Sequence, residues 1–227
     1  MFFQRILLLV FLLTSFLNRV YSQENTAINS NFFREDQFYF GASFMLLQSA
    51  EPEFQPQGLS RHLQWGFIRD LPLSRSGKFA SGIGLGMSFE RYTTNLDRIT
   101  ENTVLPQYAV SVSTHSPLYF TKHAFELPLT FRWRNATPED FAFWRIYGGV
   151  SLQWNYYNKI KQESMEIKNS NELQKLGTLA HLSFGYNTWN FYLAYQLSSF
   201  FEPTALSDES FARDLNPIKI GLIFYIL

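Results

Sequence analysis

The chain has 227 residues, enough for one domain with a sizeable core. Lysine plus arginine equals aspartate plus glutamate, at 19 each, and no segregated basic patch is visible, so we expect no nucleic-acid partner. Cysteine is absent, which excludes disulfide scaffolds, thiolate metal sites and a lipid-modified N-terminal cysteine. Aromatic residues reach 18 %, more than one soluble core of this size needs.

The N-terminus predicts a cleaved secretory signal. One early charge, Arg5, precedes an apolar run over residues 6–13, and the small Ser22 stands before Gln23. This layout predicts cleavage between Ser22 and Gln23, which gives a signal peptide of residues 1–22 and an exported mature chain. The alternative is an uncleaved signal anchor, but the apolar run is shorter than the roughly 20 residues that a spanning helix needs.

Past residue 23, apolar and polar side chains alternate with a period of two, which indicates strands with two unlike faces. The pattern predicts eight strands, at residues 38–46, 59–68, 78–92, 123–134, 143–157, 176–186, 190–198 and 218–227. An even number of strands, each of about ten residues, is typical of an outer-membrane barrel. We therefore predict an all-β, eight-stranded antiparallel transmembrane barrel over residues 38–227, with residues 23–37 as a periplasmic lead-in.

The connections support this count, because short turns alternate with long polar loops, as they do in barrels with short periplasmic turns. Residues 106–114 also alternate, but a ninth spanning strand would invert every later loop, so we interpret them as a hairpin extension outside the membrane. Proline lacks the donor that a strand ladder needs, so Pro128 predicts a bulge or a local break.

The composition of the second face indicates that the apolar face points outward to lipid. Alternate glycines at Gly82, Gly84 and Gly86 do little for solubility, whereas inside a narrow barrel they make room for long polar side chains. Aromatic residues near strand ends, such as Trp144 and Tyr186, suit a girdle at the membrane boundary. The alternative is a soluble periplasmic lipocalin-like barrel with an aromatic core.

The inward face predicts a polar network, which we expect to fill the lumen. Its members are Glu126, Arg132, Arg134, Arg145, His181 and Lys219. The three arginines should cluster near the periplasmic end, and Glu126 should meet Lys219 across the lumen, because buried charges must be paired. A polar conduit or binding cavity is the alternative, although eight strands leave no wide channel.

An outer-membrane lipid-modifying enzyme, such as a lipid A deacylase, is the competing functional class. It would need a histidine within reach of a serine and a carboxylate that orients the imidazole. His181 and Ser183 share a face, but this face is lumenal and no acid follows on the next strand. His115 and His123 near or on a loop make a weak metal site. We therefore predict no catalytic residues, no cofactor and no metal.

Four segments carry a family resemblance: "FELPLTFRWR", "FWRIYGGV", "GYNTWNFYLAY" and "KIGLIFYIL". The sequence from about residue 38 to residue 227 resembles the PorT-like outer-membrane β-barrel proteins of the Bacteroidota. The resemblance implies an outer-membrane barrel in a family whose founding member takes part in type IX secretion. It implies outer-membrane lipid and secretion-system components as partners, and it brings no catalytic motif with it.

The C-terminal strand is similar to the assembly signals of outer-membrane proteins, which end on a polar residue, a glycine, an aromatic and an apolar residue. Those positions here are Lys219, Gly221, Phe224 and Ile226. The similarity implies that the barrel-assembly machinery is a partner. Lys219 and Gly221 should face the lumen, and Phe224 and Ile226 should face lipid, while this strand closes the barrel against the first.

Overall fold

The computed structural model describes residues 36–49, 53–54, 58–74, 76–100, 105–111, 116–135, 143–208 and 215–226. All of them belong to one compact unit, Phe32–Leu227. The predicted signal peptide and its cleavage site at Ser22 and Gln23 lie outside the described residues. No helix within these ranges is long and apolar enough to cross a bilayer.

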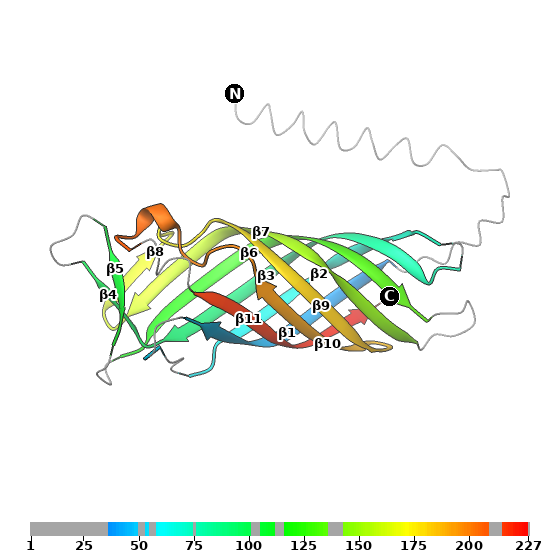
Figure 1. The fold of residues 1–227 in the computed structure, drawn as a ribbon, viewed down its shortest axis with the longest axis horizontal. Helices are drawn as coiled ribbons and strands as arrows, with labels where there is room; N and C mark the ends of the chain where they lie inside the picture. The colour runs from blue at the N-terminus through cyan, green and yellow to red at the C-terminus, as the bar shows by residue number, and fades with distance from the viewer. Residues whose placement is uncertain are drawn as a thin grey trace, which may run out of the picture. The chain divides into compact units, whose positions relative to one another are not determined.

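Eight strands close into an antiparallel barrel (Figure 1). They are β1 (Gln37–Gln48), β2 (Arg61–Pro72), β3 (Phe79–Thr94), β6 (Leu118–Arg134), β7 (Trp144–Gln162), β9 (Leu176–Tyr186), β10 (Trp189–Gln196) and β11 (Asn216–Ile226). The strand order is β6-β3-β2-β1-β11-β10-β9-β7, and the β6–β7 pairing closes the ring. The predicted fold class is therefore confirmed, and the last strand does pair with the first.

The remaining elements belong to the long connections. The strands β4 (Leu96–Ile99) and β5 (Gln107–Val110) form a separate two-stranded sheet, and β8 (Met165–Lys168) pairs with β7 alone. A short 3-10 helix, η1 (Pro203–Ala205), lies between β10 and β11. Of residues 106–114, which we expected not to span the barrel, the structure describes 106–111, and β5 within them pairs with β4 and not with a barrel strand, as expected. Residues 112–114 lie outside the described residues.

These elements gather at one end of the barrel, opposite the end where β11 finishes (Figure 1). We call the first the long-loop end and the second the short-turn end. At the short-turn end β2 is followed by β3, β6 by β7 and β9 by β10.

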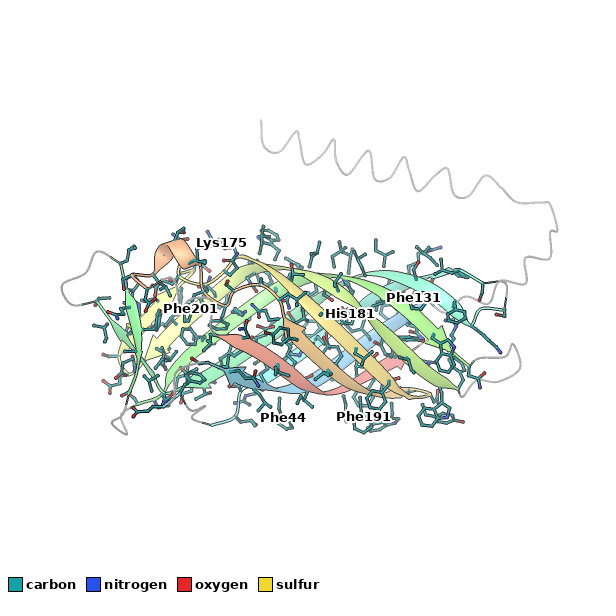
Figure 2. The ribbon with its side chains drawn as sticks, in the orientation of Figure 1. Phe44, Phe131, Lys175, His181, Phe191 and Phe201 are labelled. Carbon is teal, nitrogen blue, oxygen red and sulfur yellow. The ribbon has the colours of Figure 1, made fainter. Side chains whose placement is uncertain are left out.

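The barrel is polar inside and apolar outside. Buried and exposed residues alternate along β10, in which Phe191 is 60 % exposed and the neighbouring Asn190 is 1 % exposed. Figure 2 shows Phe44 and Phe191 on the outside of the wall and His181 in the middle of the barrel. This arrangement is the opposite of a soluble barrel, which buries its apolar face, and it is that of an outer-membrane barrel.

Glycines on the inward face make room for large side chains, as the sequence predicted. A Cβ added at Gly82 would lie 2.6 Å from Thr130 Oγ1 and 3.1 Å from Arg132 Cδ. At Gly66 the same atom would lie 2.6 Å from the hydroxyl of Tyr39, which lies across the inner wall. The glycines therefore leave the space that the large side chains of neighbouring strands occupy in the narrow lumen.

Pro128 produces a local break rather than a bulge. The β3–β6 ladder passes from the Ile83–Leu129 pair directly to the Gly86–Glu126 pair, without a change of register. The register shift lies elsewhere, between His123 and Ala124, where β7 carries one extra residue. Before this bulge the odd-numbered residues of β7 face the lumen, and beyond it the even-numbered residues do.

Candidate functional site: the lumen and its cap

The short-turn end of the lumen holds two arginines on one carboxylate. Arg132 Nη1 donates to Asp70 Oδ1 at 2.7 Å, and Arg134 Nη2 donates to Asp70 Oδ2 at 2.8 Å. All three side chains are fully buried. The guanidinium carbon of Arg132 also lies 4.2 Å from the centre of the Tyr147 ring, a cation–π contact that helps to hold the second positive charge.

Asp70 was missed by the sequence reasoning, because the second strand was predicted to end at Ile68. The strand in fact continues to Pro72, so Asp70 has the inward parity of His62 and Gln64. The predicted third arginine, Arg145, pairs opposite Arg134 in the β6–β7 ladder, and its guanidinium carbon lies 4.5 Å from the ring centre of Phe143.

The middle of the lumen holds side-chain hydrogen bonds around a very small cavity. Glu126 accepts a hydrogen bond from Gln153 Nε2 at 2.6 Å, and Ser151 Oγ lies 3.2 Å from His181 Nδ1. Glu126, Ser151 and His181 all line a cavity of about 20 Å³. Such a volume accommodates about one water molecule, and it is far too small for an acyl chain.

A second ionic cluster lies toward the long-loop end and is centred on Glu90. Lys219 Nζ donates to Glu90 Oε1, and Lys122 Nζ lies 3.3 Å from Glu90 Oε2. The Tyr92 hydroxyl donates to the same carboxylate at 2.7 Å. The expected meeting of Lys219 with Glu126 is therefore wrong. Barrel strands are tilted and staggered, so two residues equally far from their strand ends do not lie at the same height.

An aromatic cap closes the lumen above this cluster. Phe200 and Phe201, from the β10–β11 connection, are both 0 % exposed. Phe200 packs edge-on against Tyr92 at 4.9 Å and against Phe120 at 5.3 Å, between ring centres. Lys122 Nζ lies 4.7 Å from the ring centre of Phe200, so the cap contacts the Glu90 cluster directly. Figure 2 places Phe201 at the long-loop end.

A charged clamp holds the outer loops together over the aromatic cap. Arg98 of β4 donates to Glu172 through Nε and Nη2, both at 2.9 Å, and the Tyr108 hydroxyl of β5 donates to it at 2.6 Å. Burial by itself would raise the pKa of Glu172, but the hydrogen bonds from Arg98 and Tyr108 outweigh it and hold this pKa below its usual value. Burial, reinforced by the charge of Glu172, raises the pKa of Tyr108 well above its usual value.

The residues considered for chemistry do not come together as a hydrolase site. Ser183 Oγ lies 3.1 Å from the Tyr225 hydroxyl, and the histidine of that strand, His181, contacts Ser151 instead. Within the described ranges, no three His, Cys, Asp or Glu side chains are grouped so that they could hold a metal ion. His115 lies outside the described residues, and His123 lies on the outer wall among aromatic rings.

The residues of the predicted assembly signal lie on both faces of β11. Lys219 is fully buried in the lumen, whereas Ile226 is 55 % exposed on the outer wall. A Cβ at Gly221 would meet the backbone of Ser43 at 2.5 Å, so the glycine permits close pairing with β1. Phe224 packs edge-on against Trp189 with ring centres 4.7 Å apart.

Comparison with known proteins adds little to the geometry. No protein-family model and no curated protein matches the chain. Among solved structures, two of Ail, the attachment invasion locus protein of Yersinia pestis, are 12 % and 11 % identical, with TM-scores of 0.37 and 0.39. The matched regions cover 84 % and 85 % of this chain, and 96 % and 97 % of the respective Ail chains. A mutant Rh. blastica porin, 8 % identical over 86 % of this chain and 100 % of its own, has a TM-score of 0.15. Our conclusion on the fold therefore rests on the strand pairing itself.

Proposed function

We propose that the chain is a non-enzymatic outer-membrane barrel whose lumen is closed and whose long-loop end faces the cell exterior. The observation that carries this proposal is the combination of an apolar outer wall with a lumen filled by the Asp70 and Glu90 clusters. Exposed aromatic and aliphatic side chains on every barrel strand are costly in water and favourable in lipid.

Membrane fractionation together with gel migration tests the location. The protein should sediment with outer membranes, resist alkaline extraction and migrate differently before and after boiling, since a closed barrel retains its shape in detergent. Recovery in the soluble periplasmic fraction would refute the proposal.

Conductance tests the closed lumen. Purified protein in planar bilayers should give negligible current, because two ionic clusters and the aromatic cap fill the path. A Phe200→Ala/Phe201→Ala variant should still conduct poorly, since the Glu90 cluster remains beneath the aromatic cap. A large open-channel current in the wild type would refute the closed barrel.

We further propose that the protein acts in protein export rather than in catalysis. The resemblance to PorT-like proteins and the clamped loops, which give a partner a fixed surface, support this role. A deletion strain should secrete less protein into the medium, and complementation with a His181→Ala variant should restore secretion fully. Altered lipid A in the deletion strain, restored by the wild type but not by His181→Ala, would instead support the lipid-modifying enzyme.

A further inference from the structure

Basic side chains follow one another around the outer wall at the long-loop end. Strand pairing places Arg61 of β2 opposite Arg91 of β3, and Arg91 opposite Thr121 of β6. It then places Thr121 opposite Lys159 of β7, and Lys159 opposite Lys168 of β8. Opposed residues of an antiparallel pair project from the same face. Arg61, Arg91, Lys159 and Lys168 therefore lie at one level of the wall, with Thr121 between the two arginines and the two lysines, and we call them the basic row.

The basic row faces outward and not into the lumen. Arg61 and Arg91 are exposed, while the adjacent His62 and Glu90 are 1 % and 3 % exposed. The Lys168 side chain is 63 % exposed and that of Lys159 is 29 % exposed. The sequence did not reveal this patch because its four residues lie on four different strands, and the earlier expectation of no segregated basic patch is wrong for the outer wall.

The charge of the basic row is not balanced within the described residues. Arg61 and Arg91 lie directly opposite each other, and no acidic side chain among the described residues pairs with either. At the other end of the row lies one acid, Glu166. Its Oε2 is 4.0 Å from Lys159 Nζ, and its Oε1 is 3.2 Å from Lys168 Nζ. Directly opposed like charges destabilise a sheet. A bound anion would remove this cost.

The outer wall directly below the basic row is mostly apolar and aromatic, with His123 packed among the rings. Toward the short-turn end, the next outward residues are Leu63, opposite Phe89, and then Trp65, which stacks on Phe89 with ring centres 4.8 Å apart. Farther round the wall, Phe125 and Trp154 are 45 % and 55 % exposed. A ligand that covers both the basic row and the apolar wall below it must carry an anionic head and apolar chains.

We propose that the basic row binds the phosphate groups of a phosphorylated, multiply acylated glycolipid of the outer leaflet, whose acyl chains pack against the aromatic wall below. Arginine matches phosphate with two parallel hydrogen bonds, and lysine adds a mobile point charge. A soluble anion or an acidic protein segment would use the charged level but not the apolar one. This inference rests on the proposed membrane location with the long loops outside.

The paired basic side chains lie on one side of the barrel, from β2 to β8. At the same end, the outward residues Leu176 of β9, Leu46 of β1 and Leu197 after β10 are 67 %, 50 % and 55 % exposed, and the exposed Lys175 precedes Leu176 as a single basic residue. A nonspecific attraction to anionic headgroups would need no such sidedness. The basic row therefore defines a discrete site of a few lipid molecules at most.

Native mass spectrometry of the full chain in a neutral detergent tests the site with bisphosphorylated lipid A as the probe. Two double variants, Arg61→Gln/Arg91→Gln and Lys159→Gln/Lys168→Gln, should each bind this probe about tenfold more weakly than the wild type. Glu166→Gln should bind it more tightly, because it removes the acid from the row. Arg69→Gln is the matched control, since Arg69 is an exposed arginine on the outer wall of β2 at the other end.

Heat-modifiable migration establishes that each variant is folded, which these exposed substitutions should permit. Binding by the double variants equal to that of the wild type would overturn the proposal, as would equal binding of dephosphorylated lipid A. Displacement of the probe by inorganic phosphate would overturn the lipid assignment and leave a simple anion site. Insertion into phosphatidylcholine vesicles without lipid A tests the membrane location separately, so failure of the site and failure of the location are distinguishable.

Discussion

Lys219 on the last strand donates a hydrogen bond to Glu90 on β3, across a lumen in which β11 and β3 are separated by β1 and β2. The same carboxylate lies 3.3 Å from Lys122 of β6. One buried acid therefore connects three strands of the wall, β3, β6 and the C-terminal strand β11. A buried charge is costly when its partner is removed, so both lysines depend on Glu90 for their counter-charge.

Glu90→Gln should therefore lower the free energy of unfolding by about 3–5 kcal/mol, because it leaves two buried lysines without a counter-charge. Urea unfolding in vesicles, followed by tryptophan fluorescence, measures the change. Glu166→Gln is the control: it removes the same charge from an exposed site, where solvent screens the charge and the loss of stability should be much smaller. An equal loss in the two variants would show that the Glu90 cluster does not stabilise the barrel.

Gly82→Ala should destabilise the barrel by about 1–3 kcal/mol, the usual cost of overpacking a filled interior. The new Cβ would meet Thr130 Oγ1 at 2.6 Å and Ile68 Cγ2 at 2.8 Å, and β-branched side chains move little about χ1. Gly177→Ala is the matched control, because its nearest contact is 3.3 Å, from the end of Gln153. The same urea experiment compares the two, and a larger loss for Gly177→Ala would contradict the argument.

The eight strands and their orientation could be predicted because the alternation of apolar and polar residues reflects which face is buried. In segment 78–92, for example, one face carries Phe79, Ile83, Leu85, Met87 and Phe89. The polar pairings could not, since they depend on strand stagger. Glu126 and Lys219 are equally far from the ends of their predicted strands, yet Lys219 donates its hydrogen bond to Glu90. The same limitation hid the basic row, whose members Arg61 and Lys168 are remote in the sequence and are brought together only by the register of the wall.

The clamp of Arg98, Tyr108 and Glu172 should make the long-loop end sensitive to acid. The pKa of Glu172 is lower in the folded protein than its ordinary value of 4.5, so its contribution to stability is present above that value. The contribution is lost as the pH falls from 4.5 through the folded pKa. Hydrogen exchange at the backbone amides of residues 107–110 and 170–174 should therefore speed up over this acid range, while exchange in the barrel strands should not.

Glu172→Gln supplies the control for that experiment. A glutamine cannot titrate, so exchange in the same loops should be faster than in the wild type at neutral pH and should show little further change on acidification. Acid-dependent loop exchange that persists in Glu172→Gln would assign the transition to another group.

Removal of residues 224–227 should block assembly of the barrel. Phe224 and Ile226 pair with Phe40 and Phe38 of β1, so the truncated β11 would leave the start of β1, up to Phe40, as an open edge. Backbone groups at an open edge within a bilayer have no partner and are costly. Heat-modifiable migration of the protein in outer membranes measures assembly. Phe224→Tyr is the control, because it retains the aromatic ring and the full strand, and it should assemble like the wild type. A truncated chain that still inserts and shows heat-modifiable migration would show that closure of β1 by the end of β11 is dispensable.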